Sequence, residues 1–548
     1  MRTRRLDTWD GIAGLGFLLL AVFLVLPLGK LLWASVVADG GGLTLRHYAE
    51  FLGRPYYSRT IGHSFLVAGL VTLASMLLAL PLAWITARVA IPGALVLRTL
   101  AILPLVSPPF IGAYSWILLF GRSGYVTATL QGWGLTLPTV YGMRGIVLAL
   151  TLNLYPLAFL VIQGGLRTVD HSLEEAAEGL GSPRWRVFLT VTAPVLLPSI
   201  LAGALLVFLT AFADFGAPMI IGEGYQVLPT IVYSLFVNEM GGPPAMASTA
   251  ATILVLCTMA LLLAQWWLTG RRSYAMSQLR PTPPVRLRPA VRGLLTVLAY
   301  GIVGLSLIPA VVVGVTSFFE ARGPVLYPRF STGNYREIFF NVPGALLNSL
   351  TLSSLSTALD VLIGTLIAYL VVRRRSPVTA GLDSAVMLPY AIPGTVVGIA
   401  YIVAFNAPPL VLTGTFVILV LAYAVRRLPY SVRAGAAILH QIDPSVEEAS
   451  VSLGVPPLRT FLRVTARLML PGIVSGGILT WVQTITEISA TIFLYTAAWS
   501  TVTVLIYRQV SSSNFGAAAA ASSLLLVAVF VPVLLVNWSL GERAEASV

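Results

Sequence analysis

Long apolar runs alternate with short polar segments along the whole chain. A helix that crosses a bilayer needs about 20 mainly apolar residues, and each of these runs is long enough. Six runs fall in each half of the chain. The predicted spans are at about 12–36, 62–87, 96–120, 143–165, 195–217 and 246–269, then 291–317, 346–371, 381–405, 410–430, 470–492 and 514–538. The pattern predicts an all-α membrane protein with about 12 transmembrane helices.

One polar stretch between apolar runs occurs twice, without gaps and 273 residues apart. Residues 170–200 read DHSLEEAAEGLGSPRWRVFLTVTAPVLLPSI, and residues 443–473 read DPSVEEASVSLGVPPLRTFLRVTARLMLPGI. We call residues 170–198 the first polar element and residues 443–471 the second polar element. Both copies share an aspartate, paired glutamates, a glycine and a proline. Such a pair indicates an internal duplication.

The duplication extends beyond the polar elements. LPLVSP at 103–108 corresponds to LPYAIP at 388–393, and Asp214 corresponds to Glu487. The proline pairs in the first match are predicted to kink the third and ninth spans. We therefore predict two repeats joined by a Pro- and Arg-rich connector. Their predicted bounds are 1–269 for the first repeat (core about 60–266), 270–292 for the connector and 293–548 for the second repeat (core about 345–537).

The composition supports a membrane protein and excludes several other classes. The chain is 57% hydrophobic and 10% charged, with a mean hydropathy of +0.88, whereas soluble domains carry about 25% charged residues. The net charge of +13 does not indicate nucleic-acid binding, because the arginines lie between apolar runs and not with aromatic residues on one soluble face. The lone Cys257 excludes a disulfide framework and a cysteine metal site.

The distribution of positive charge predicts the orientation. Most of the 34 lysines and arginines fall in the connections on the same side as the N-terminus, and residues 218–245 on the other side contain none. Because positively charged loops stay in the cytoplasm, the N-terminus is predicted to be cytoplasmic. Six spans per repeat return the chain to that side. Both polar elements and the C-terminus are then cytoplasmic, and the two six-helix repeats are parallel.

Each polar element is predicted to form a helix–turn–helix on the cytoplasmic face. Asp170 stands at or just before the start of the first helix, where an aspartate caps well. Glu174 and Glu175 follow in the first turn, which the helix dipole favours. Gly181 is predicted to end the helix and Pro183 to prevent it from continuing. Two equivalent polar surfaces imply a two-fold symmetric partner.

The spacing of these residues resembles a known motif. Glu175-Ala176-Ala177 is followed after three residues by Gly181 and after nine more by Val191, as in the EAA motif of permease subunits in type I ABC importers. The resemblance implies the type I ABC importer permease fold and a location in the bacterial inner membrane. It also implies that the polar elements bind the ATPase subunits and couple them to transport. The implied coupling residues are Glu174, Glu175, Ala176, Ala177, Gly181 and Pro183, with Glu447, Glu448, Ala449, Ser450, Gly454 and Pro456. The second copy departs at Ser450 and Arg467, so reduced symmetry is expected there.

The same resemblance implies the partners. They are two copies of a cytoplasmic ABC ATPase, which would hold the ATP and Mg²⁺, and a periplasmic substrate-binding protein. Residues 212–236 and 485–509 resemble the fused permeases of ferric iron importers. Related permeases carry thiamine, an aminoalkylphosphonate or a polyamine, and these substrates stay open as alternatives.

No catalytic motif is present, so the chain is predicted not to be an enzyme. A P-loop needs a lysine followed by Ser or Thr, and the only lysine, Lys30, precedes Leu31. No bound cofactor or resident metal is predicted. Asp214 and Glu487 are acidic residues in predicted spans, and such residues are functional candidates; they are predicted to line the substrate path or a gate. Two other classes stay open: an ion-coupled secondary transporter and a membrane scaffold without transport activity.

Overall fold

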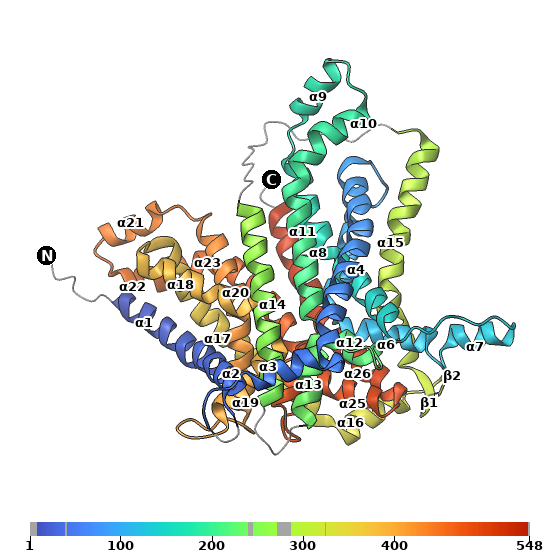
Figure 1. The fold of residues 1–548 in the computed structure, drawn as a ribbon. Helices are drawn as coiled ribbons and strands as arrows, with labels where there is room; N and C mark the ends of the chain where they lie inside the picture. Colours follow the sequence, from blue (N-terminus) through green and yellow to red (C-terminus); the bar gives the residue numbers. More distant parts are fainter. Residues whose placement is uncertain (1–7, 39–40, 239–244, 271–286, 324, 546–548) are drawn as a thin grey trace.

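The computed structural model describes residues 8–38, 41–238, 245–270, 287–323 and 325–545. Helices make up almost all of it (Figure 1). The helices of the first half are α1 (Thr8–Leu20), η1 (Ala21–Val25), α2 (Leu26–Val36), α3 (Arg46–Gly53), α4 (Pro55–Arg88), α5 (Ala94–Val106), α6 (Pro109–Phe120), α7 (Tyr125–Gly132), α8 (Met143–Thr168), α9 (His171–Gly179), α10 (Arg184–Val187), η2 (Phe188–Thr192), α11 (Ala193–Ala213), α12 (Gly216–Ile221), α13 (Leu228–Asn238) and α14 (Ala245–Gly270).

The second half follows the same general order, but it adds an antiparallel hairpin of β1 and β2 and a 3-10 turn, η3, and within its described residues it has no counterpart to α7. Its elements are α15 (Pro289–Thr316), β1 (Phe319–Arg322), β2 (Val325–Phe330), α16 (Gly333–Asn341), α17 (Pro343–Arg373), α18 (Pro377–Met387), η3 (Leu388–Ala391), α19 (Gly394–Phe405), α20 (Phe416–Leu439), α21 (Ser445–Ser452), α22 (Pro457–Thr460), η4 (Phe461–Thr465), α23 (Ala466–Ile485), α24 (Thr491–Leu494), α25 (Val502–Ser511) and α26 (Phe515–Glu545). We call the side of the molecule that carries α9 and α21 the inner side, following the predicted orientation, and the opposite side the outer side.

The membrane-spanning pattern largely agrees with the prediction. Among the described residues, nine helices are long and apolar enough to cross a membrane, and eleven if two bent pairs count as one span each. The bends are 94° between α5 and α6–α7, and 104° between α18–η3 and α19. Pro108 and Pro393 precede α6 and α19, so the predicted proline kinks are confirmed as sharp breaks.

The predicted span at 410–430 is the one that differs in kind. It forms α20, a long helix that packs against α17 and α23. Arg426, Arg427 and Arg433 lie within it, so α20 is not among the nine apolar helices or the two bent pairs. The apolar residues around these arginines keep the average hydropathy of the segment high, which is why the sequence predicted a span here.

The predicted spans 195–217 and 470–492 were extended too far. Helix α11 ends at Ala213 and helix α23 ends at Ile485. In each case the carboxylate just beyond the end accepts the backbone N–H three residues further on: Asp214 Oδ1 from Ala217 at 2.9 Å, and Glu487 Oε1 from Ala490 at 3.1 Å. Such local bonds between a side chain and the backbone compete with continuation of the helix. The chain therefore turns at both residues.

The first span of each half packs against the opposite half. Helices α1 and α2 contact α17, α18 and α19, whereas α15 contacts α4, α5 and α6 (Figure 1). Hydrogen bonds hold the first span of each half against the opposite half. Lys30 donates to the carbonyl of Ala404 at 3.0 Å, and Ser115 donates to the carbonyl of Pro309 at 2.9 Å. The π-turn η1 leaves the carbonyl of Phe23 to accept the hydroxyl of Tyr401 at 2.7 Å.

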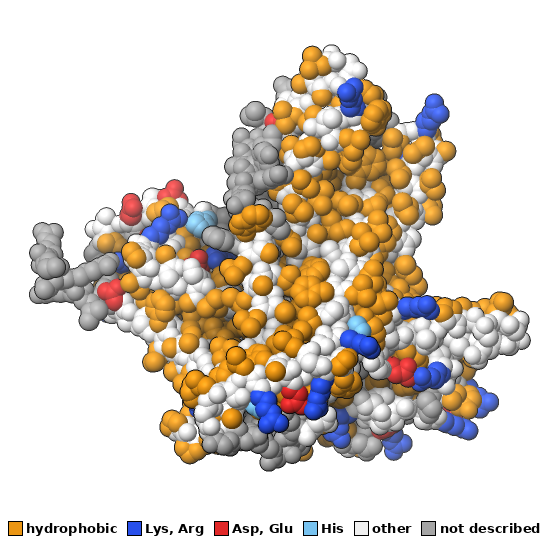
Figure 2. Space-filling view, in the orientation of Figure 1, with side chains coloured by type: hydrophobic (Ala, Val, Ile, Leu, Met, Phe, Trp, Pro, Cys, Tyr) orange, Lys and Arg blue, Asp and Glu red, His pale blue; other side chains and the backbone are white. Residues whose placement is uncertain are grey.

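The surface of the molecule matches a lipid environment. In Figure 2, apolar side chains cover the sides of the upright helices, and charged side chains gather at the two ends. Many large apolar residues are exposed there, such as Leu73 and Leu77 on α4 and Leu294 and Val297 on α15. A soluble protein does not expose contiguous apolar surface of this extent.

Candidate functional site

The first polar element has the predicted helix–turn–helix geometry. Asp170 caps α9, since its side chain accepts the N–H of Ser172 at 2.9 Å. Gly181 follows α9 with φ +84°, a left-handed conformation that a side chain disfavours. Pro183 then precedes α10, which continues through η2 into α11. One rigid path therefore leads from the element into a membrane span.

The second polar element repeats this geometry. Asp443 stands just before the start of α21 and accepts the N–H of Ser445 at 2.8 Å, which lowers the pKa of this carboxyl. Gly454 has φ +83°. Pro456 caps α22, and η4 leads into α23. The two turns are thus conformational copies of each other.

A buried ion pair holds the first polar element to the membrane helices. Glu174 accepts two hydrogen bonds from Arg88 at the end of α4, at 3.0 and 2.9 Å, and a third from Thr192 at 2.7 Å. The side chains of Arg88 and Glu174 are only 5% and 15% exposed. A bidentate pair of this kind is strong and directional. These bonds connect α9 directly to α4 and to η2.

The second polar element has the corresponding anchor with different partners. Glu447 pairs with Arg373 at the end of α17 at 3.1 Å and accepts the hydroxyl of Tyr369 at 3.0 Å. Arg373 also donates to the carbonyl of Ile442 at 2.6 Å. Thr465, which corresponds to Thr192, has no hydrogen-bond partner for its buried Oγ1. The anchor is present in both copies, but the two copies are not equivalent.

The outward faces of the two elements, meaning the faces that point away from the membrane helices on the inner side, expose apolar and acidic residues. Leu180 and Leu453, just before the turn glycines, are 88% and 85% exposed. The second glutamate of each pair, Glu175 or Glu448, is exposed as well. The remaining predicted residues are exposed or half-buried: Ala176, Ala177, Pro183, Ala449, Ser450 and Pro456. Exposed leucines beside carboxylates suit a protein partner better than lipid or water.

A cavity of about 230 Å³ lies between the two halves, and both predicted path residues line it. Asp214 reaches it from the end of α11 and Glu487 from the end of α23. The breaks between α5 and α6 and between α18 and α19 form two other walls. The lining residues that matter below are Pro109, Phe110, Asp214, Arg426, Arg427 and Glu487. The duplication thus brings two residues 273 positions apart into one cavity.

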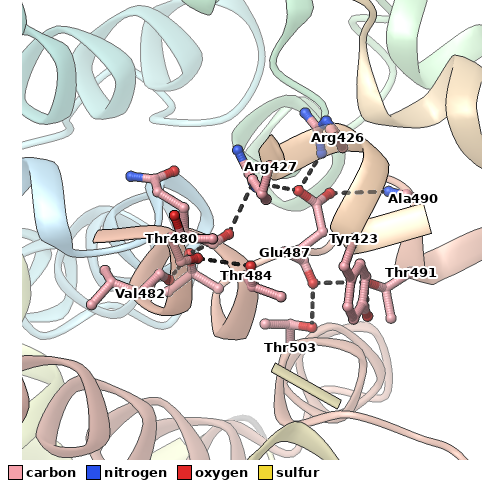
Figure 3. A network of polar contacts seen from close by, with 12 residues as sticks. Tyr423, Arg426, Arg427, Thr480, Val482, Thr484, Glu487, Ala490, Thr491 and Thr503 are labelled. Carbon is pink, nitrogen blue, oxygen red and sulfur yellow. Dashed lines mark hydrogen bonds and ion pairs between the residues drawn. The ribbon is translucent and has the colours of Figure 1, made fainter. Parts of the chain in front are cut away.

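Glu487 is held by two arginines from α20 (Figure 3). Arg427 donates to Glu487 at 2.7 Å and to the carbonyl of Gln483 at 2.9 Å, and Arg426 donates to the same carboxylate. The side chains of Glu487, Arg427 and Arg426 are 4%, 11% and 18% exposed. Thr503 donates to the Glu487 carbonyl at 2.9 Å. Glu487 is therefore largely neutralised, whereas within the described residues no arginine forms an ion pair with Asp214.

The first half has no matching arginine pair. Asn153 occupies the position equivalent to Arg426. Its amide donates to the carbonyls of Pro104 and Ser107 at 2.7 and 2.8 Å, which satisfies the backbone at the break between α5 and α6. In the second half, the guanidinium of Arg426 lies against Gly394 at the start of α19. The cavity is therefore electrostatically asymmetric despite the duplication.

Sequence reasoning missed four of these charged residues. Arg88 and Arg373 stand at the ends of corresponding spans, α4 and α17. An arginine at this position in both halves was a signal in the sequence that each could pair with a glutamate of the nearby polar element. Arg426 and Arg427 form an arginine pair inside a predicted span, which is costly in a membrane and marks a functional or structural site. The pairing partners depend on the three-dimensional arrangement, which the spacing does not give.

Comparison with known proteins agrees with this geometry. The profile of the family described as "Binding-protein-dependent transport system inner membrane component" matches residues 79–272 and 360–540, one match in each half. The chain belongs to this family. It is a multi-pass inner-membrane permease component of a binding-protein-dependent ABC importer, and it is not itself the ATPase. Such a permease works with an ATPase and a binding protein.

Several curated permeases are similar over most of the chain. The ferric transport system permease protein FbpB of Actinobacillus pleuropneumoniae is 31% identical over 96% of this chain and 78% of its own length. A putative ferric transport system permease protein FbpB 1 of Haemophilus influenzae is 32% identical over 88% of this chain and 77% of its own length. The molybdenum transport system permease protein ModB of Escherichia coli is 34% identical, but the match covers 37% of this chain and 90% of ModB. Almost a whole ModB chain therefore matches a stretch shorter than half of this permease.

Proposed function

We propose that this chain is the fused permease of a ferric iron importer. Two ATPase subunits bind the outward faces of the polar elements, and a periplasmic binding protein delivers the substrate at the outer side. The observation that carries the coupling role is the anchor found in both copies, Glu174 with Arg88 and Glu447 with Arg373. Ferric iron is supported by the ferric permeases similar over nearly the whole chain.

The geometry supports a simple transmission mechanism. When the ATPases close, α9 and α21 move together with their anchored spans α4 and α17. Helix α11 has 21 residues and is therefore about 30 Å long. It joins the first polar element at one end to Asp214 at the other. Movement at the inner side thus displaces the carboxylates that line the cavity, and the two halves rock around them.

We propose that Asp214 and Glu487 have different roles in the substrate path. Glu487 is neutralised by two arginines and fixes α23 to α20. Asp214 accepts the N–H of Ala217 and is half-buried at the cavity wall. It is the carboxylate better placed to meet a passing cation. Thiamine, an aminoalkylphosphonate or a polyamine stay as alternative substrates of the same architecture.

We also propose the arrangement of the repeats and termini. The repeats are 1–269 and 293–548, joined by a cytoplasmic connector at 270–292, most of which lies outside the described residues. Helix α14 ends at Gly270 and α15 begins at Pro289, so the proposed connector overlaps the first turn of α15. Trp9, near the start of α1, contacts Phe461 of the second polar element with ring centroids 5.6 Å apart. This contact supports an N-terminus on the cytoplasmic side. The proposal that the C-terminus lies there too rests on counting α20 as a twelfth span, beside the nine helices and the two bent pairs.

Replacing Gly181 or Gly454 by valine is expected to weaken ATPase binding and uptake. A left-handed backbone costs a residue with a side chain roughly 1–2 kcal/mol, and no neighbouring atom lies within 4 Å of an added Cβ at either glycine. The effect therefore arises from the turn alone. Co-purification of the ATPase and substrate uptake measure it. Gly179→Val is the matched control, because Gly179 has equal space in the same element without a positive φ. Normal binding and uptake in both turn variants would exclude a coupling role.

Replacing Asp214 by asparagine is expected to lower uptake of radioactive ferric iron severalfold while the protein stays folded. The change removes one negative charge from the cavity but keeps a side chain that can accept the N–H of Ala217. Uptake into cells that also produce the ATPase and binding protein is the measurement. Unchanged uptake by Asp214→Asn would remove this residue from the path.

The energy source of uptake is a separate test. Wild-type uptake should persist when the proton gradient is collapsed and ATP is present; its loss would instead support an ion-coupled transporter.

A further inference from the structure

The connection between α6 and α8 in the first half leaves the helical bundle. We call residues 123–142 the outer arm; it contains α7, which projects sideways in Figure 1. The corresponding connection in the second half, between α19 and α20, spans only residues 406–415 and contains no helix. The outer arm is therefore an addition to one half of a duplicated structure, and the transport architecture does not require it twice.

Both ends of the outer arm are fixed at the outer ends of membrane spans. Tyr125 donates to the carbonyl of Leu326 at 2.7 Å and packs against Phe319, and both partners belong to the hairpin that follows α15. At the other end, the N–H of Gly142 donates to the carbonyl of Ile221 at 2.9 Å, and the span α8 begins with the next residue. The arm thus leaves and rejoins the bundle near the outer ends of the helices.

Helix α7 runs crosswise to the membrane-spanning helices (Figure 1). The segment Pro109–Gly132, which comprises α6 and α7, is bent by 94° from α5. Because α5 forms the first part of a span, α6 and α7 run across the spans and not along them. Figure 1 shows α7 lying crosswise to α15 and directed away from the molecule.

The outer arm contains no charged residue. From Ser123 to Met143 there is no Asp, Glu, Lys, Arg or His, whereas Arg122 and Arg144 stand just outside this range. The neighbouring hairpin, by contrast, carries Glu320, Arg322 and Arg329. Surface segments in water normally carry charge. A segment without charge can enter the membrane boundary without burying an ionised side chain, which is costly in lipid.

Large apolar side chains are exposed at the far end of the arm. Trp133, Leu135 and Leu137 are 73%, 56% and 40% exposed. Tryptophan is enriched at membrane–water interfaces, because its ring is apolar and its N–H is polar. Trp133, Leu135 and Leu137 therefore expose three large apolar side chains within five residues, outside the helical bundle.

We propose that the outer arm lies in the boundary between headgroups and acyl chains of the outer leaflet, with Trp133, Leu135 and Leu137 inserted into lipid. A soluble periplasmic protein is a poorer occupant, because it approaches from the water above the outer side, whereas the arm extends sideways from the bundle. The arm also continues α6, whose first residues Pro109 and Phe110 line the cavity. It therefore links the outer leaflet to one wall of the cavity. The proposal does not depend on which substrate the permease carries.

Nitroxide accessibility tests this placement on the full chain. Cys257, the sole cysteine, is replaced by alanine, and a spin label is attached through Leu135→Cys or, in a second variant, Leu137→Cys. The matched control is Arg329→Cys on the charged hairpin of the same side. Each protein is placed in nanodiscs of phosphatidylethanolamine and phosphatidylglycerol, which leave both faces open to the solvent. Collision with oxygen reports lipid, and collision with a water-soluble nickel chelate reports water.

The labels at 135 and 137 are expected to show severalfold higher oxygen and lower nickel accessibility than the label at 329. Adding Trp133→Glu to the Leu135→Cys variant is expected to shift its label toward water, because a carboxylate at the tip resists insertion. Nickel accessibility at 135 and 137 equal to that at 329 would overturn the proposal. Protection that develops only when the loaded binding protein is added would also overturn it, and would make the arm a protein-docking surface.

Discussion

Replacing Glu487 by glutamine is expected to destabilise the permease strongly and to abolish uptake. The change leaves Arg426 and Arg427 in the cavity wall without the carboxylate that they share, since both donate to Glu487. Removing one partner of a buried ion pair typically costs about 3–5 kcal/mol, because the remaining charge stays uncompensated. Here two like charges are left side by side. Thermal unfolding of the purified protein in detergent and uptake in cells measure the two effects.

Two further variants separate this effect from a general sensitivity of the cavity. Asp214→Asn changes the other carboxylate in the same cavity, which forms no ion pair with an arginine in the described part of the chain. This variant is expected to unfold near the wild-type temperature. The triple variant R426Q/R427Q/E487Q removes all three charges, and it should regain much of the stability lost in Glu487→Gln. If Glu487→Gln unfolded at the same temperature as Asp214→Asn, the arginine–glutamate cluster would contribute little to stability.

Replacing Arg88 by methionine is expected to uncouple ATP hydrolysis from uptake. Methionine keeps the apolar packing of the arginine stem but removes both hydrogen bonds to Glu174. Breaking a buried pair of this kind costs about 3–5 kcal/mol, and here the cost falls on the contact between α9 and α4. The ATPase should still hydrolyse ATP in the complex, while substrate uptake falls by at least an order of magnitude. Hydrolysis and uptake are measured on the same proteoliposomes.

An exposed ion pair in the same chain supplies the control. Arg122 and Glu223 pair at 2.5 Å on the outer side, with side chains 73% and 48% exposed. Exposed pairs contribute little to stability, so Arg122→Met is expected to leave both hydrolysis and uptake near wild type. Arg373→Met should repeat the Arg88→Met result through the second polar element. Coupled transport in both anchor variants would contradict the transmission path through α4 and α17.

The sequence alone predicted the features that depend on local order. The turn at Gly181, the cap at Asp170 and the breaks at Pro108 and Pro393 all follow from the conformational limits of single residues. The duplication then carried each feature to the second half. The sequence also placed Asp214 and Glu487 at corresponding positions of two parallel repeats, and in the structure both line one cavity.

Features that depend on packing between distant segments were not predictable from the sequence. Apolar runs identify spans but not their neighbours, so nothing in the pattern showed that α2 and α15 pack on the opposite halves. Average hydropathy also concealed Arg426 and Arg427 within an apolar run. The early ends of α11 and α23 were missed because Asp214 and Glu487 look like residues of a continuous helix until their backbone hydrogen bonds are seen.

The exchange of first spans has a consequence for how the protein is made. Lys30 bonds to Ala404, 374 positions away, and Tyr401 bonds to Phe23, 378 positions away. The helix that leaves the ribosome first therefore cannot form these bonds until α19 has been synthesised. During that interval the face of α4–α6 that will receive α15 is also uncovered. Lipid must solvate both surfaces until translation is nearly complete. Joining the halves in one polypeptide ensures that the missing partner arrives in the same place and in equal number.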